Sequence, residues 1–348
     1  MEPALSSGGM QARVTMAELA KELGVAESTV SRALRGDPRI SAATRGRVKE
    51  AAARLNYRPN AMVSALMSMR RHGGGGGEAD TVALITDYPG VGGWRSKDVC
   101  RWEYDGICER ADRLGYRVEE FALAEYGGGK RLEKALVTRG IRGVLLGFSR
   151  NHRTELDLDL NQFSVAGLST YFHDMRVDRA NFHGLYNVRL ALKEMRLRGY
   201  ARTGLVVPEF NNRISGYQWS GSALDWQRHR THDEGCPPLI LEEAGAEASF
   251  GRWFRAERPD ALLVYKLNVR AWLARLGVRV PQDVALAHLY RTGTEMRETA
   301  GIDGNLHLVG AAAFDLVVEA LQTHRTGLSE HPKEVLIKGL WREALATP

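Results

Sequence analysis

Apolar residues recur at helical spacing along residues 16–34, and Gly24 divides this run into two short segments. Thr15 precedes the first segment and Glu18 follows three residues later, which is the pattern of a capping box at a helix start. Ser41 would cap a third helix, whose apolar residues close a small core beneath the first two: Val48, Ala52 and Leu55. Two short helices joined at a glycine predict a helix-turn-helix, a motif whose second helix enters the major groove of DNA.

From Asp80 onward, short apolar runs alternate with longer helical segments. The runs of strand length are 81–86, 118–123, 143–148, 163–168, 203–207, 239–241, 261–265 and 284–289. Helical patterns lie between them, at 99–114, 180–198, 268–276 and 306–323. Strands separated by helices of this length are typical of βαβ units and parallel sheets. About 270 residues exceed a typical single core, so we expect an α/β fold with two lobes.

The excess positive charge lies entirely in the first part of the chain. Residues 1–72 contain twelve Lys and Arg but six Asp and Glu, whereas the remaining residues hold 36 of each sign. A basic patch confined to one small domain is typical of a protein that binds a polyanion such as DNA. The alternative is a solvated basic face on an ordinary helical domain, but capping, turn and spacing also favour DNA binding.

Four motifs make the prediction more specific: M-A-E-L-A (16–20), G-V-A-E-S-T-V-S-R (24–32), P-R-I-S-A-A-T-R (38–45) and L-N-Y-R-P-N-A (55–61). With these motifs the segment resembles the headpiece of the lactose/galactose-repressor family of bacterial transcription regulators. The resemblance implies a helix-turn-helix domain over residues 13–58, a hinge helix over 59–70 and a glycine-rich linker over 71–79. A two-lobed core that resembles a periplasmic sugar-binding protein would follow over residues 80–348.

The resemblance also implies which residues contact operator DNA. Glu27, Ser28 and Arg32 match positions that face base edges, and arginine is the best bidentate reader of guanine. Residues at the phosphate-contacting positions would fix the register without reading sequence: Thr15, Thr29, Ser31, Arg35, Ser41, Thr44, Tyr57 and Asn60. Ala26 departs from the family pattern, because a capping serine usually stands there. Losing such a cap costs roughly 1 kcal/mol.

In that family the segment after the proline becomes helical on operator DNA. Here it would begin with Asn60 as N-cap, and Leu66 matches a leucine that wedges into the minor groove. A core leucine is the alternative, although the neighbouring run of five glycines offers little core to join. That glycine run could also cradle a phosphate, but it precedes a strand rather than opening a helix, which favours a flexible linker.

The resemblance implies a first lobe of roughly 80–200 plus 307–328, and a second of roughly 201–306 plus a strand near 334–338. The cleft between them would hold a small effector. Asp87, at a strand end, matches a ligand-facing position. Other expected sugar clamps are replaced: Gln218 stands where the family often has an arginine, and a strand that usually ends in Asn-Asp is followed by Lys266 and Leu267.

A further strand is followed by Tyr290 and Arg291 where the family has an aspartate. A plain neutral hexose is therefore a poor candidate effector, whereas Lys266 would suit a carboxylate or phosphate, as in a sugar acid or sugar phosphate. The alternative is that the cleft binds nothing tightly. Three tryptophans could stack on a ligand ring or simply belong to the core: Trp94, Trp219 and Trp226.

The remaining signals exclude several classes of protein. The three cysteines are widely spread, which fits a reducing cytoplasm without disulfides, and no apolar run is long enough for a signal peptide or a membrane span. His229, His232 and Cys236 have a spacing that could hold a metal, but structural zinc prefers four ligands in tighter pairs, so we expect a polar surface loop. No catalytic motif is present, and no cofactor is implied.

We therefore expect a cytoplasmic regulator, most simply a homodimeric repressor on a palindromic operator. The rival is a solute-binding or enzymatic core with a vestigial headpiece.

Overall fold

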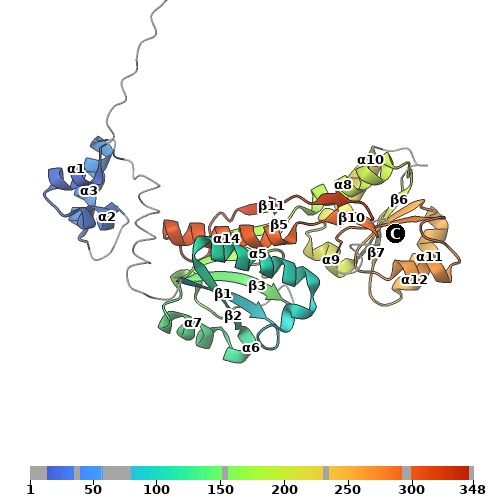
Figure 1. Ribbon diagram of the computed structural model, residues 1–348, viewed down its shortest axis with the longest axis horizontal. Coiled ribbons are helices and arrows are strands. Elements are labelled where there is room, and N and C mark those ends of the chain that lie inside the picture. The colour runs from blue at the N-terminus through green and yellow to red at the C-terminus, as the bar shows by residue number, and fades with distance from the viewer. Residues whose placement is uncertain are drawn as a thin grey trace, which may run out of the picture. The chain divides into compact units, whose positions relative to one another are not determined.

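The computed structural model describes residues 14–34, 40–55, 57, 80–150, 156–229, 235–291 and 299–344 (Figure 1). The chain divides into two compact units, Met1–Gly77 and Glu78–Pro348. The expected hinge helix over 59–70 and the glycine linker over 71–79 lie outside the described residues. Each unit is considered by itself below.

Among the described residues of the first unit there are three helices, α1 (Met16–Leu23), α2 (Glu27–Leu34) and α3 (Ala42–Arg54). The predicted capping box is confirmed, because the Thr15 side chain accepts from Glu18 N while Glu18 Oε2 accepts from Thr15 N at 2.7 Å. Gly24 ends α1 in the left-handed conformation (φ 65°), which a glycine adopts without steric cost. Small buried side chains from all three helices form the core: Leu19, Ala20, Val30, Ala33, Val48, Ala51 and Ala52.

The second unit begins with a six-stranded parallel sheet. Its order is β11 (Glu334–Ile337), β5 (Arg179–Phe182), β4 (Ser164–Leu168), β3 (Gly143–Ser149), β1 (Asp80–Asp87) and β2 (Tyr116–Ala122). The register is regular in the middle, where Val82 pairs with Val118 on one side and with Gly143 on the other. Every residue of β3 is buried, as expected for a parallel strand that is covered on both faces.

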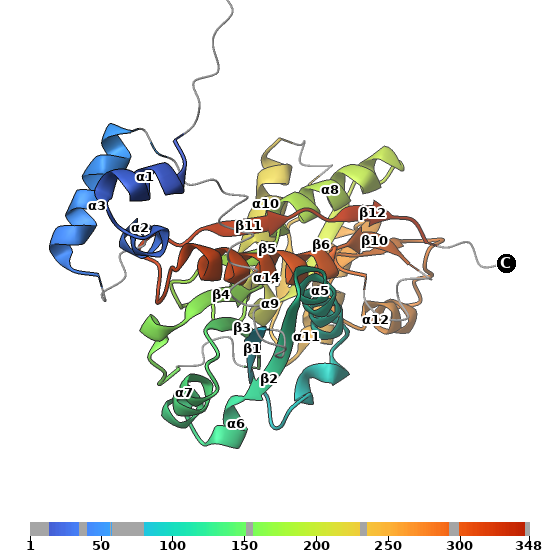
Figure 2. The same cartoon turned by 60° about the vertical axis from the view of Figure 1, so that its left-hand side comes forward.

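Helices cover both faces of this first sheet. Helices α5 (Asp98–Leu114) and α14 (Leu306–Thr323) lie side by side on one face, and α6 (Leu123–Tyr126) and α7 (Gly129–Thr138) lie on the other, as Figures 1 and 2 show. Gly106 and Gly310 permit the close approach of α5 and α14, because a Cβ at either glycine would overlap a carbonyl oxygen of the other helix. Two short 3-10 turns complete the lobe, η1 (Gly93–Ser96) and η2 (Leu160–Gln162).

Among the described helices, α14 alone is long and apolar enough to cross a membrane. Nine of its residues are buried, and it packs against α5 and four strands of the first sheet, β3, β4, β5 and β11. These are the contacts of a core helix, so its apolar character is explained by the fold.

A second six-stranded sheet forms the other lobe. Its order is β12 (Leu340–Arg342), β10 (Ala300–Asp303), β9 (Ala285–His288), β8 (Ala261–Val264), β6 (Thr203–Pro208) and β7 (Leu239–Leu241), and only β12 is antiparallel to its neighbour. Helices α8 (Gly184–Leu197) and α10 (Gln218–Arg228) pack on one face. Helices α11 (Ala246–Glu257) and α12 (Val269–Arg275) cover the other, and α9 (Glu209–Ile214) follows β6.

The chain passes three times between the two lobes: from β5 to α8, from β10 to α14, and from β11 to β12. The expected lobe boundaries are therefore wrong in two places. Helix α8 packs on the second sheet through Val188 and Leu192, so the first lobe ends near residue 182 rather than 200. The strand at 334–337 pairs with β5 in the first sheet, and it is the following strand, β12, that joins the second.

Candidate DNA-binding surface and effector cleft

Helix α2 presents its polar residues on one face. Glu27, Ser28 and Arg32 are exposed, whereas Val30 and Ala33 on the same helix are completely buried against α1 and α3. Residues four apart lie on one side of a helix, so Ser28 and Arg32 are neighbours on this surface. The burial of the opposite face leaves these three side chains available to an external partner.

Several of the expected phosphate-contacting hydroxyls cap helices. The Thr15 hydroxyl donates to Glu18 Oε2 at 3.0 Å, and the Ser41 oxygen accepts from Thr44 N at 3.2 Å at the start of α3. Thr29 and Ser31 are half-buried on α2. Arg35, Asn60 and Leu66 lie outside the described residues.

Tyr57 follows α3 and returns to the headpiece core, where its N–H donates to Ala52 O at 2.8 Å. Burial, followed by the nearby Glu27 carboxylate, raises the pKa of Tyr57. The phenol therefore stays protonated beside the exposed face of α2, where its hydroxyl can donate a hydrogen bond.

In the second unit, a cavity of about 230 Å³ lies between the lobes, at the carboxyl ends of both sheets. Parallel α/β sheets gather ligands at this edge. Its walls come from α5 and the segments after β1, β3 and β4 in the first lobe, and from α9, α10 and the segments after β8 and β9 in the second. The lining includes Tyr88, Lys97, Cys100, Glu103, Arg150, Ser169, Tyr171, Phe182, Phe210, Trp219, Tyr265, Lys266 and Tyr290.

Aromatic rings form much of the second lobe's side of the cavity. The ring of Trp219 lies with its centroid 4.9 Å from that of Tyr265 and 6.0 Å from that of Tyr290. Phe182 packs edge-on against Tyr290 at 5.1 Å. These contacts hold the rings in fixed orientations, so the cavity offers flat apolar faces to a ligand.

Among the described residues that line the cavity, Glu103 is the only one with a carboxyl group, and its side chain is completely buried. The Ser169 hydroxyl donates to Glu103 Oε1, whereas Oε2 has no hydrogen-bond partner among the described residues. Burial raises the pKa of Glu103 to about 8, against smaller lowering effects of Ser169, Tyr171 and Lys266. At neutral pH the group is therefore mainly protonated and can donate a hydrogen bond through Oε2.

Three cations lie among the same lining residues. Lys97 and Arg150 belong to the first lobe and Lys266 to the second, and all three are exposed at the rim. The Lys266 Nζ lies 5.1 Å from the centroid of the Tyr265 ring. Partial burial lowers the pKa of Lys266, but Tyr265, Cys100 and Glu103 outweigh it, and the net shift is upward. With three cations and one carboxyl group among its described lining residues, the cavity carries net positive charge.

Of the predicted effector residues, Lys266 and Tyr290 line the cavity, but three others do not. Trp94 is 1% exposed in the core of the first lobe, where its Nε1 donates to Glu120 at 2.8 Å. Gln218 Oε1 accepts from Leu185 N at 3.2 Å, and Asp87 lies beside the Ser149 hydroxyl at 3.4 Å. Trp94 is thus a core residue, and Gln218 supports the start of α8.

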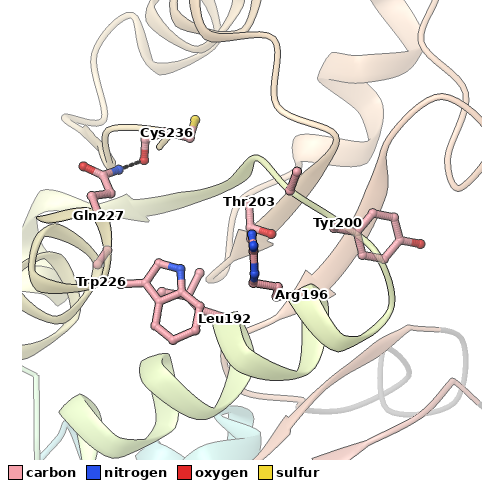
Figure 3. A pocket seen from close by; sticks show the side chains of 9 residues that line it. Leu192, Arg196, Tyr200, Thr203, Trp226, Gln227 and Cys236 are labelled. Carbon is pink, nitrogen blue, oxygen red and sulfur yellow. Dashed lines mark hydrogen bonds between the residues drawn. The ribbon is translucent and has the colours of Figure 1, made fainter. Parts of the chain in front are cut away.

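Trp226 and Cys236 belong to a different cavity, in the second lobe (Figure 3). It measures about 10 Å³, and the Gln227 side chain donates to the backbone oxygen of Cys236 at its edge. A space of this size holds at most one water molecule. Of the considered metal ligands, His229 bonds to Asp225 O at 3.0 Å through Nδ1, Cys236 is buried, and His232 lies outside the described residues.

The chain therefore combines a unit of helix-turn-helix type with two α/β lobes, each built on a six-stranded sheet. Residues 15–60 match the model of the bacterial regulatory proteins of the lacI family. The segment is 44% identical over 57 residues to catabolite control protein A of Staphylococcus epidermidis and 42% identical to that of Priestia megaterium. Each match spans 16% of this chain and 17% of the relative.

Two solved structures have the same fold over nearly their whole length. One is the complex of the transcriptional regulator CelR with cellobiose, with a TM-score of 0.53 and 18% identity. The other is the Lac repressor dimer bound to operator and the anti-inducer ONPF, with a TM-score of 0.51 and 17% identity. Both comparisons cover 95% of this chain and 98% of the other. The expected fold class is thereby confirmed; one of the matched proteins is named a transcriptional regulator and the other a repressor.

Proposed function

We propose that this protein is a DNA-binding transcription regulator, most simply a repressor, that acts in the cytoplasm as a homodimer on a palindromic operator. The observation that carries the proposal is the exposed face of α2 in a lacI-family domain, where Glu27, Ser28 and Arg32 stand clear of the core. A symmetric dimer would present two such helices to two half-sites one helical turn apart.

Base reading is assigned to three side chains in this proposal. Arg32 would form a bidentate contact with a guanine, Glu27 would accept from a cytosine amino group, and Ser28 would bond to either. The hydroxyls near the helix ends, with Tyr57, would contact phosphates, and Arg35 and Asn60 would join them. Leu66 would enter the minor groove, so Leu66→Ala is expected to reduce DNA bending without changing the melting temperature of the core.

A small-molecule effector would bind in the cavity between the lobes. Its volume, about 230 Å³, is close to the lower end for ligand pockets, which begin at roughly 300 Å³. Because three chain segments connect the lobes, a ligand that touches both would favour one lobe arrangement over the other. That preference would shift DNA affinity by a change in population. The alternative is that the cleft binds nothing tightly. The buried Oε2 of Glu103 argues against it, because this atom has no hydrogen-bond partner among the described residues and a ligand could supply one.

Selection from randomised DNA duplexes tests the proposal with the purified full-length protein. We expect enrichment of a palindromic sequence, tight binding of that sequence, and a dimer in sedimentation. Arg32→Ala should abolish the enrichment, whereas Lys193→Ala, an exposed charge in α8 of the second unit, should not. A protein that enriches no sequence, or binds all duplexes alike, would contradict the proposed function.

A further inference from the structure

The two lobes offer different polar groups to the same cavity. Glu103 comes from α5 of the first lobe and Lys266 from the loop after β8 of the second. They are close enough for the lysine charge to act on the carboxyl group, and the carboxyl group on the lysine. No ion pair joins Lys266 to a carboxylate within the described ranges.

The backbone around both groups is strained. Ser169, which donates to Glu103, has φ 46°, and Lys266 has φ 47°, so each occupies the left-handed region that non-glycine residues rarely adopt. Such conformations cost on the order of 1–3 kcal/mol and persist where the surrounding structure holds them, often at ligand sites. Here one strained residue from each lobe lines the cavity.

The Oε2 atom of Glu103 is buried and has no hydrogen-bond partner among the described residues. A completely buried carboxyl group without a counterion favours its protonated form, since an isolated charge away from water is costly. Its Oε2 then carries a donor with no acceptor among the described residues. An acceptor atom on a ligand would complete the pair.

The chemistry of the cavity walls limits what else the ligand contains. The rings of Trp219, Tyr265 and Tyr290 provide flat faces, which suit a ring. The ammonium of Lys266, with Lys97 and Arg150 at the rim, favours an anion. A neutral polyol would offer these cations no opposite charge.

We infer that the effector is a ring compound bearing an anionic group, which Lys266 and the Glu103 carboxyl group hold together from opposite lobes. The inference rests on the proposed function, whose cavity it describes more closely. Because the anionic group bridges the lobes, ligand binding stabilises the arrangement in which Glu103 and Lys266 approach each other. A carboxylate or a phosphate supplies the required oxygen atoms, and either can stand on an aromatic ring or on a sugar ring.

Calorimetric titration of the full-length protein tests the inference with matched probes. The acids are benzoate, glucuronate and glucose 6-phosphate, and the neutral counterparts are benzyl alcohol and glucose. We expect at least one acid to bind and its counterpart to bind about tenfold more weakly or not at all. The acid that binds identifies the ring and the anionic group.

Variants of the two groups separate charge from hydrogen bonding. Lys266→Met should weaken acid binding about tenfold to hundredfold, whereas Lys266→Arg should retain most of it. Glu103→Gln keeps a donor and should retain binding at neutral pH, but Glu103→Met should lose it. Two exposed positions provide controls that should bind like the unmodified protein, Lys193→Met and Glu109→Gln. Thermal unfolding establishes that each variant is folded.

The inference is overturned if no acid binds at millimolar concentration, if a neutral counterpart binds as tightly as its acid, or if a folded Lys266→Met variant binds normally. Its failure is distinguishable from failure of the proposed function, because DNA selection is carried out without ligand. A protein that selects a palindrome but fails the titrations remains a regulator with a different effector.

Discussion

The side-chain amide of Asn187 donates a hydrogen bond of 3.1 Å to the hydroxyl oxygen of Tyr290. The same side chain accepts from Gly339 N at 2.8 Å, in the third passage of the chain between the lobes. Tyr290 also packs against Phe182 at the first passage and against Gly304 at the second, where an added Cβ would lie 2.7 Å from the tyrosine ring. One residue of the effector cavity thus contacts, directly or through Asn187, all three connections.

Tyr290→Phe should therefore destabilise the second unit and weaken the link between ligand and lobe arrangement. The substitution leaves the buried amide of Asn187 without its acceptor, which costs about 1–3 kcal/mol. Denaturant unfolding measures the free energy, with Tyr200→Phe as the control because Tyr200 lies away from the connections, in the small cavity of the second lobe. Equal unfolding free energies for the two variants would show that the Asn187 bond is unimportant.

Gly310→Ala should destabilise the first lobe severely. A Cβ there would overlap the carbonyl oxygen of Glu103, so α5 and α14 would have to separate. Overpacking of this kind costs about 1–3 kcal/mol and sometimes more. Gly221→Ala in α10 is a matched control, since that glycine has open space around its Cβ position and alanine favours helix by about 1 kcal/mol. Thermal unfolding should give a lower melting temperature for Gly310→Ala and a slightly higher one for Gly221→Ala than for the unmodified protein. The reverse order would refute the packing argument.

Arg32→Ala should remove sequence discrimination while leaving weak, salt-sensitive attachment to DNA. One lost bidentate contact costs about 1–3 kcal/mol per half-site, and a symmetric dimer has two. Fluorescence anisotropy with the selected palindrome and a scrambled duplex measures the ratio of affinities. Lys49→Ala, an exposed charge on α3, should lower both affinities together. An unchanged ratio in Arg32→Ala would remove this residue from base reading.

The stability of the second unit should fall as pH rises from about 4.5 to 8. Burial raises the pKa of Glu103 to about 8, so the folded state keeps a proton that the unfolded state releases in this window. The stabilisation is fully present below the pKa that Glu103 has in the unfolded chain. It is lost as the pH rises through the pKa that Glu103 has in the folded protein. One such group changes the unfolding free energy by up to about 1.4 kcal/mol per pH unit.

Denaturant unfolding at several pH values measures the slope of the unfolding free energy against pH. Glu103→Gln should flatten it, whereas Glu109→Gln, at an exposed position of the same helix, should leave it unchanged. Ser169 and Tyr171 contact Glu103 from the loop after β4, Cys100 lies on its own helix, and Lys266 faces it from the second lobe. An identical slope in Glu103→Gln would assign the pH dependence to other groups.

Much of the fold follows from the pattern of apolar residues. All eight predicted strands correspond to strands of the structure, and the helix expected over 306–323 has those bounds. The strand β5 was missed because most of its residues were assigned to the helical pattern expected over 180–198, whereas α8 begins only at Gly184. Strand β10 was missed because it is four residues long and contains Gly301, which passes close to the backbone of His288.

Residues of the effector cavity could be predicted where they follow strands, but less well where they lie within helices. Lys266 and Tyr290 were found because they follow apolar strands, and that edge of a parallel sheet faces the ligand. Glu103 was missed because a charged residue in a helix usually faces water. A signal was present, since Cys100, Glu103, Ile107 and Ala111 follow the spacing of the buried stripe of α5. Trp94 was misplaced because sequence does not distinguish a tryptophan in a core from one beside a cleft.

The three passages between the lobes have a consequence for the order in which the protein is made. Each sheet receives its outermost strand from the last part of the chain, β11 for the first lobe and β12 for the second. During synthesis, both lobes must therefore wait, with one edge unpaired, until residues 334–342 have left the ribosome. Truncation before residue 334 would therefore remove an edge strand from both sheets at once.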